Sequence, residues 1–106
     1  MIYVQLAGKR YPANILGRVR DNDWNGRESK AITLEMAFDE AKALFTDDCL
    51  WSIVCPGDET EAVYDNSAFS VAGPITDHRN GTVTVKMGKP TAEERLAQLM
   101  ARYGEA

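Results

Sequence analysis

Residues 75–87, Ile75-Thr76-Asp77-His78-Arg79-Asn80-Gly81-Thr82-Val83-Thr84-Val85-Lys86-Met87, carry the strongest fold signal in the chain. Two strand-like segments flank Asn80-Gly81, a residue pair preferred in turns where both central residues need a positive φ. The apolar residues after the turn alternate with polar ones, which is the period of a strand with one buried face. The stretch therefore predicts an antiparallel hairpin with strands over 75–79 and 82–87.

Further strand patterns precede this hairpin. The segments concerned are residues 2–6, 10–20, 32–36, 50–55, 62–64 and 69–71. Pro12 and Gly17 interrupt the second segment, so we expect an edge or bulged strand there. The apolar run 50–55 is continuous and ends at a Pro-Gly turn, so it is the candidate for the central strand. Helical spacing of apolar residues predicts one short helix over 38–47.

The C-terminal segment is the clearest helix, over about 91–103. Thr91 and Glu94 have the spacing of a capping box, and one apolar stripe follows. The stripe consists of Leu96, Leu99, Met100 and Tyr103. We expect the stripe to dock on the alternating apolar face of residues 83–87, which would make the helix part of the core; the alternative is that it stays exposed and pairs with a second copy.

These elements predict an α+β fold in one domain, residues 1–106. We expect an antiparallel curled sheet, or a partly open β-barrel, of about six or seven strands. One helix is inserted in the middle of the chain and one lies at its C-terminal end. Two helices among many strands disfavour parallel βαβ winding.

Composition agrees with a folded domain. The chain has 106 residues, 44% of them apolar and 26% charged. No stretch has the length of a membrane span, and residues 2–6 lack the features of a signal peptide. We therefore expect a cytoplasmic or virion-associated protein that does not bind membranes.

The charges are unevenly distributed. Residues 1–36 hold six basic and four acidic side chains, whereas residues 37–70 hold one lysine and eight acids. The acids are Asp39, Glu40, Asp47, Asp48, Asp58, Glu59, Glu61 and Asp65. This acidic middle repels phosphates, so we expect no nucleic-acid partner. It is either a solvated surface or a patch that docks on a basic protein.

The segment 21–29, Asp21-Asn22-Asp23-Trp24-Asn25-Gly26-Arg27-Glu28-Ser29, begins like a calcium-binding loop. The twelfth loop position, which needs a bidentate Glu, is Ile32. The loop also joins two predicted strands rather than two helices, so no metal site is predicted. Trp24 either folds back over the core or serves as an anchor for a partner. Arg18, Arg20 and Arg27 are the candidates to stack on it or to bind the acids around it.

Residues for catalysis are scarce. His78 lies beside a turn, where side chains are usually solvated, and Asp77 points to the opposite face of a strand. Cys49 and Cys55 are predicted as reduced thiols of one strand, too far apart for a disulfide. There is no glycine-rich phosphate loop and no C-x-x-C pair. We therefore expect no enzyme activity and no cofactor.

A resemblance adds a biological setting. Three strings of residues carry it: Arg20-Asp21-x-Asp23-Trp24-x-x-Arg27-Glu28-Ser29, Tyr64-Asp65-Asn66-Ser67, and residues 75–83 followed by Gly88-Lys89-Pro90-Thr91. They resemble short uncharacterised proteins of Gram-positive gut bacteria and their prophages. The resemblance covers most of the chain and implies an origin among phage-like genes. It assigns no activity and no site residue.

The function expected from the sequence is a non-enzymatic protein interaction or structural module, such as a phage virion or tail-associated component. One alternative is a phage accessory inhibitor that blocks a basic host protein with its acidic surface, and another is a small-ligand-binding barrel. The partner is expected to be a protein, with homo-oligomers allowed. The candidate partner-binding residues are Trp24, Arg27, Asp58, Glu59 and Glu61.

Overall fold

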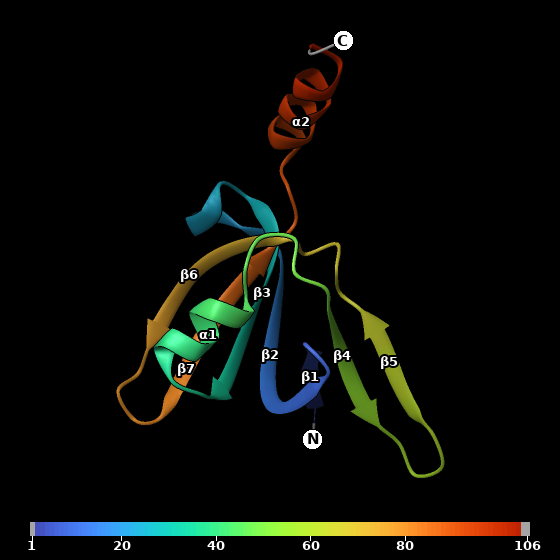
Figure 1. Ribbon diagram of the computed structural model, residues 1–106. Coiled ribbons are helices and arrows are strands. Elements are labelled where there is room, and N and C mark those ends of the chain that lie inside the picture. Colours follow the sequence, from blue (N-terminus) through green and yellow to red (C-terminus); the bar gives the residue numbers. More distant parts are fainter. Residues whose placement is uncertain (1, 105–106) are drawn as a thin grey trace.

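A computed structural model describes residues 2–104 of the chain (Figure 1). The strands are β1 (Ile2–Leu6), β2 (Lys9–Asp21), β3 (Arg27–Glu35), β4 (Trp51–Pro56), β5 (Glu61–Asp65), β6 (Val71–Asp77) and β7 (Thr82–Gly88). The helices are a short 3-10 helix (Asn22–Trp24), α1 (Phe38–Leu44) and α2 (Ala92–Gly104).

The strands form one antiparallel sheet of seven strands in the order β5-β4-β1-β2-β3-β7-β6. The two end strands, β5 and β6, are not paired with each other, so the sheet is open rather than closed into a barrel. The predicted α+β class, the strand number and both helix positions are thereby confirmed. All neighbouring pairs are antiparallel.

Strand β2 joins the two halves of the sheet. Its first part pairs with β1, and its second part, from Ala13 onward, pairs with β3. Figure 1 shows how the strand curves between these parts, so that the two halves of the sheet diverge around a shared interior. This curvature gives the predicted curled sheet its inner face.

The core lies on that inner face. Ile32 pairs with Val85 and Leu34 with Val83, and all four are almost completely buried. Trp51 and Phe69 meet edge to face in the same core, with ring centroids 6.3 Å apart. Helix α1 covers β6 and β7, and contributes Ala41 to the core.

The sequence placed the wrong strand at the centre of the sheet. The run 50–55 forms β4, which is one strand from the edge, and the central strand is β2. Pro12 is tolerated in β2 because it pairs with β1 before β3 begins to pair at Ala13. At Pro12 the strand therefore has a neighbour on one side only, and no hydrogen bond is lost. A predicted irregularity does occur, as a register shift between Arg18 and Asp21.

The hairpin predicted within residues 75–87 is present, but its turn differs from the prediction. Strands β6 and β7 are joined by residues 78–81, and the positive φ angles belong to Arg79 (58°) and Gly81 (90°). Asn80 instead accepts hydrogen bonds from the backbone and hydroxyl of Thr82. Two consecutive residues with positive φ occur instead at Ala7-Gly8, between β1 and β2, and at Asn25-Gly26, before β3.

Two smaller expectations were also wrong. Residues 69–71 do not form a separate strand: Phe69 is a core residue in the loop before β6. Cys49 lies before β4 rather than in it, and both cysteines are half-buried free thiols. Burial is the main cause that raises the pKa of the Cys49 thiol.

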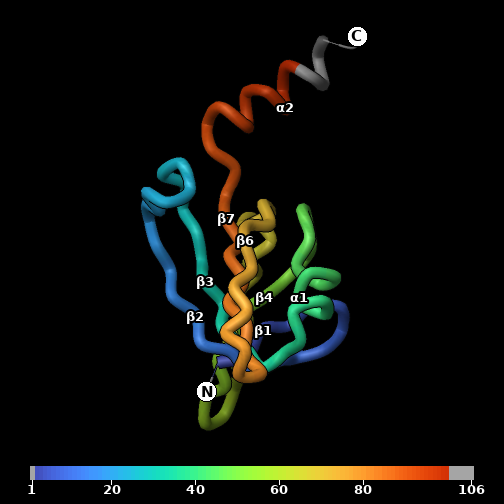
Figure 2. The backbone as a smooth tube through the Cα atoms, turned by 90° about the vertical axis from the view of Figure 1, so that its left-hand side faces the viewer, coloured from blue at the N-terminus to red at the C-terminus, as the bar shows by residue number. Residues whose placement is uncertain are grey.

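Helix α2 leaves the body of the domain, and Figures 1 and 2 both show it extending past the ends of β6 and β7. Leu96, Leu99 and Met100 are 58%, 47% and 65% exposed. The expected docking on residues 83–87 is therefore wrong, because that face is filled by the domain's own core. Tyr103, the fourth member of the predicted stripe, lies outside the residues whose side chains are described. Within residues 2–104, no helix is long and apolar enough to cross a membrane.

Candidate interaction site at the base of the C-terminal helix

The β2–β3 connection folds back over the sheet and places Trp24 against two strands. Asp21 precedes the 3-10 helix and accepts a hydrogen bond from the backbone of Asp23 at 3.0 Å. Asn25 and Gly26 then adopt positive φ angles of 59° and 71°, which return the chain into β3. Trp24 is half-buried, so it closes the end of the sheet rather than extending into solvent.

The indole of Trp24 packs directly on the backbone of two glycines, at positions where a larger residue would clash with the ring. A Cβ atom at Gly73 in β6 would lie 2.6 Å from the Trp24 ring, and one at Gly88 in β7 would lie 2.7 Å from it. Side chains at these positions would therefore displace the ring. Of the two roles left open for Trp24, the structure shows the folded-back one.

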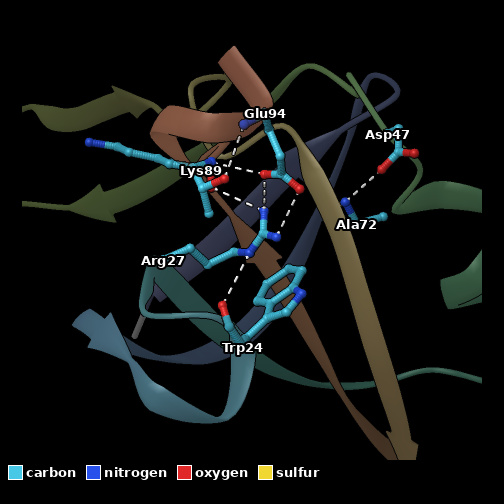
Figure 3. Close-up of polar contacts among 7 residues, drawn as sticks. Trp24, Arg27, Asp47, Ala72, Lys89 and Glu94 are labelled. Atoms are coloured by element: carbon cyan, nitrogen blue, oxygen red, sulfur yellow. Dashed lines mark hydrogen bonds and ion pairs between the residues drawn. The ribbon is translucent and has the colours of Figure 1, made fainter. Parts of the chain in front are cut away.

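Arg27 connects this loop to helix α2 (Figure 3). Its guanidinium lies 4.5 Å from the centre of the Trp24 ring and donates two hydrogen bonds to Glu94, at 2.8 and 3.0 Å. It also donates to the backbone carbonyl of Lys89 at 3.3 Å. The Arg27 side chain is only 4% exposed, so these acceptors replace the water it has lost.

Glu94 serves two functions at the start of α2. It accepts a hydrogen bond from the backbone of Thr91 at 2.8 Å, and its own backbone donates to the Thr91 hydroxyl at 3.2 Å. The predicted capping box is therefore confirmed. The Arg27 hydrogen bonds, followed by that of Thr91, lower the pKa of Glu94 from 4.5 to about 2. One carboxylate thus both caps the helix and attaches it to the sheet.

This attachment predicts a pH dependence of stability. A carboxylate whose pKa falls on folding stabilises the protein above its unfolded pKa, near 4.5, and loses that contribution as pH falls towards about 2. Glu94→Gln should lower the free energy of unfolding at neutral pH and remove this component. Because Glu94 is 41% exposed, solvent screening limits the difference to about 1 kcal/mol.

Urea unfolding of both chains between pH 2 and pH 7 measures the effect, as the difference between the two curves at each pH. Glu93→Gln is the matched control, because Glu93 is the adjacent, exposed acid. An unchanged difference between wild type and Glu94→Gln across the whole range would contradict the attachment.

A second polar cluster lies beneath the loop, around Asp21. This carboxylate is fully buried and accepts hydrogen bonds from Lys86 at 2.9 Å and Ser29 at 3.0 Å. Lys86, more than any other contact, lowers the pKa of Asp21. Two neighbouring strands and the loop therefore meet at this side chain. The first residue of the calcium-like motif thus fixes the loop by pairing with a lysine.

An open groove of about 610 Å³ separates α2 from the β2–β3 connection. Its walls include Gly26 on one side and Arg95, Leu96 and Leu99 on the other, with Pro90 between them. Arg20 runs alongside Gly26, since its Nε atom lies 3.4 Å from where a Cβ of that glycine would be. Two exposed apolar side chains, Leu96 and Leu99, therefore lie in a groove with a mixed polar lining, with Arg95 in one wall and Arg20 next to Gly26 at the other.

The five residues predicted to bind a partner lie in two separate places. Trp24 and Arg27 meet at the base of α2, whereas Asp58 and Glu59 are exposed in the turn between β4 and β5. Figures 1 and 2 both show this turn at the opposite end of the sheet from α2. Glu61 follows the turn and is held by Arg10 through contacts of 2.6 and 2.9 Å.

Several acids of the middle segment have structural partners of their own. Asp47 accepts a hydrogen bond from the backbone of Ala72 at 2.8 Å (Figure 3), and Asp65 accepts two from Ser67. Asp39 and Glu40 lie in the first turn of α1, near β6 and β7 rather than near β5. The acidic middle is therefore spread over distant parts of the domain.

His78 belongs to a chain of surface hydrogen bonds. Its Nε2 atom lies 2.7 Å from the hydroxyl of Thr84, which lies 2.8 Å from the hydroxyl of Thr33. The three residues joined by these hydrogen bonds, His78, Thr84 and Thr33, are exposed or half-buried, and neither cysteine is among them. The arrangement resembles a cross-strand ladder more than an acid–base site.

The sequence predicts the pairing of Thr91 with Glu94 and places Arg27 among the arginines near Trp24, but it does not predict the contact between Arg27 and Glu94. The two residues are 67 positions apart, and their meeting depends on β3 pairing with β7. Gly88 and Pro90 bracket the chain where it approaches Trp24, but neither residue alone indicates what it approaches. Comparisons with protein-family models, curated proteins and solved structures give no match.

Proposed function

We propose that the protein is a non-enzymatic interaction or structural module, and that its binding element is α2 with the groove at its base. The observation that carries this proposal is the apolar stripe of Leu96, Leu99 and Met100, about half or more exposed on a helix attached to the sheet at its first turn. Such contiguous exposed apolar surface marks an interaction site in a folded protein.

The attachment of the helix supports a binding role over that of a loose tail. Arg27 and Glu94 fix the first turn of α2, and the capping box satisfies backbone groups there. A helix held at its base loses less conformational freedom on binding than an unstructured segment does. Glu94 occupies the side of the helix that meets Arg27, which leaves Leu96 and Leu99 free to line the groove.

The described polar clusters support a non-enzymatic role. Asp21, Ser29 and Lys86 bind one another beneath the loop, and the carboxylate is fully buried. His78 contacts only a threonine hydroxyl in its hydrogen-bond chain. These groups act as cross-links between strands, and a reacting substrate would have to displace them.

The acidic inhibitor is the weaker alternative, because its acids are dispersed and several are engaged by the domain itself. A ligand-binding barrel is weaker still, because the sheet is open. A phage particle is the proposed setting, and it rests on the resemblance of the sequence. Mass spectrometry of purified particles tests that setting.

Site-specific photo-crosslinking tests the role of α2. A photoreactive amino acid at Leu99 should form a crosslinked species in the cells that produce the protein, because the side chain lines the groove. The matched control is the same residue at Leu16, which is 62% exposed on β2 and does not line the groove. Absence of any crosslinked species at Leu99, in producing cells and in purified particles, would contradict the proposed role.

A further inference from the structure

The two ends of the domain carry complementary surfaces. One end has the groove between α2 and the β2–β3 connection, which contains the apolar side chains of Leu96 and Leu99 and has Arg95 and Arg20 at its margins. The other end has the β4–β5 hairpin, whose turn protrudes beyond the other strands in both views of the backbone (Figures 1 and 2). The hollow surface and the protruding one therefore face in opposite directions.

The groove end offers unpaired positive charge. Arg20 and Arg95 are exposed, and neither has an ion pair among the residues that the structure describes. Lys89, on the groove floor, is paired with Glu28 at 3.1 Å. Glu93 is not among the residues that line the groove. The unpaired charges at the margin of the groove are therefore positive.

The hairpin end offers unpaired negative charge beside apolar surface. Asp58 and Glu59 are exposed and have no ion pair among the described residues. Glu61 keeps Arg10 occupied. In the following strand, β5, the side chains of Val63 and Tyr64 are 51% and 58% exposed. β5 is an end strand with only one neighbour in the sheet.

We infer that the groove at the base of α2 receives the β4–β5 hairpin of a second copy of this chain. Asp58 and Glu59 of one copy would lie between Arg20 and Arg95 of the next, and the apolar side chains of β5 would contact Leu96 and Leu99. This inference rests on the proposed function of α2 and names its partner. Because the two surfaces lie on different ends, the contact is heterologous, and a pair of copies retains one free groove and one free hairpin.

The contact should be weak and dependent on salt. A hairpin tip in a groove of about 610 Å³ gives a small interface, at the low end of the range for specific association. Its charge pairs lie at the margin, where salt screens them. Association should therefore increase with protein concentration and decrease as salt is raised.

Sedimentation velocity of the full chain, up to about 1 mM so that a millimolar Kd is detected, is the test. Two charge reversals are compared: Arg20→Glu/Arg95→Glu at the groove and Asp58→Lys/Glu59→Lys at the hairpin. Each should weaken self-association roughly tenfold or more, because like charges then meet. Asp39→Lys/Glu40→Lys on α1 changes the net charge as much as the hairpin reversal does; it is the control for that variant and should leave association unchanged. Circular dichroism verifies that all chains are folded.

A mixture of the two variants tests whether the groove of one copy binds the hairpin of another. An equimolar mixture of the groove and hairpin variants should associate again, since each variant supplies the surface that complements the other. A wild-type chain that stays monomeric, or a mixture that stays monomeric, would overturn the inference. So would association unaffected by the hairpin reversal, which indicates pairing of α2 with α2. A monomer that still crosslinks to another protein through Leu99 would overturn the inference and leave the proposed function standing.

Discussion

Replacing Trp51 by alanine is expected to lower the free energy of unfolding by about 3–5 kcal/mol. Trp51 is 1% exposed, and its indole nitrogen donates a hydrogen bond to the carbonyl of Phe69 at 3.1 Å. Removing the indole leaves a cavity between the halves of the sheet and an unpaired carbonyl in the loop before β6. A loss of this size is a large fraction of the total stability of a small domain.

Chemical denaturation measured by circular dichroism gives this value. The control is Leu50→Ala at the adjacent position, where the side chain is 78% exposed and the change should stay within about 0.5 kcal/mol. Equal effects at the two positions would show that the interior of the curled sheet is not where the structure places it.

The second large effect is expected at Gly73. Gly73→Ala places a Cβ atom 2.6 Å from the Trp24 ring, so the ring must move or the strand must shift. We expect a loss of about 1–3 kcal/mol, as for other overpacked sites. Gly17→Ala is the control, because no heavy atom lies within 4 Å of its added Cβ. That substitution should be neutral or stabilise by up to about 1 kcal/mol.

A double-mutant cycle assigns the loss to Trp24. In a Trp24→Ala background the ring is absent, so Gly73→Ala should cost little more than Gly17→Ala. A cost at Gly73 that is the same with and without Trp24 would mean that the indole does not cover β6.

Local sequence patterns predicted which strands and helices form better than they predicted which strands lie next to one another in the sheet. The alternation in residues 82–87 and the Thr91–Glu94 spacing report on residues close together in sequence, and both β7 and α2 were predicted within a few residues. The predicted edge position of β2 was wrong because that prediction assumed the strand has the same neighbours along its whole length, including at Pro12. Its neighbours change at Ala13, and that change is a property of the sheet.

The candidate site was only partly predictable for the same reason. The stripe of α2 was visible in the sequence, but whether it docks depends on whether a free apolar face lies within reach. The inner face of residues 83–87 is already covered by other core side chains of the domain, including Ala41 of α1. The attachment of Glu94 to Arg27 then orients the helix, and no local pattern contains that pair.

In a single copy of the chain, the apolar stripe of α2 is exposed beside its groove. Thiol labelling of Leu99→Cys, in a chain whose own cysteines are replaced by alanine, tests it most directly at low micromolar concentration. Val85→Cys in the same background is the comparison, because Val85 is fully buried. The structure predicts that the thiol at position 99 reacts nearly as fast as in the unfolded chain while the thiol at 85 is protected. Protection at position 99 as strong as at 85, and independent of protein concentration, would contradict the account.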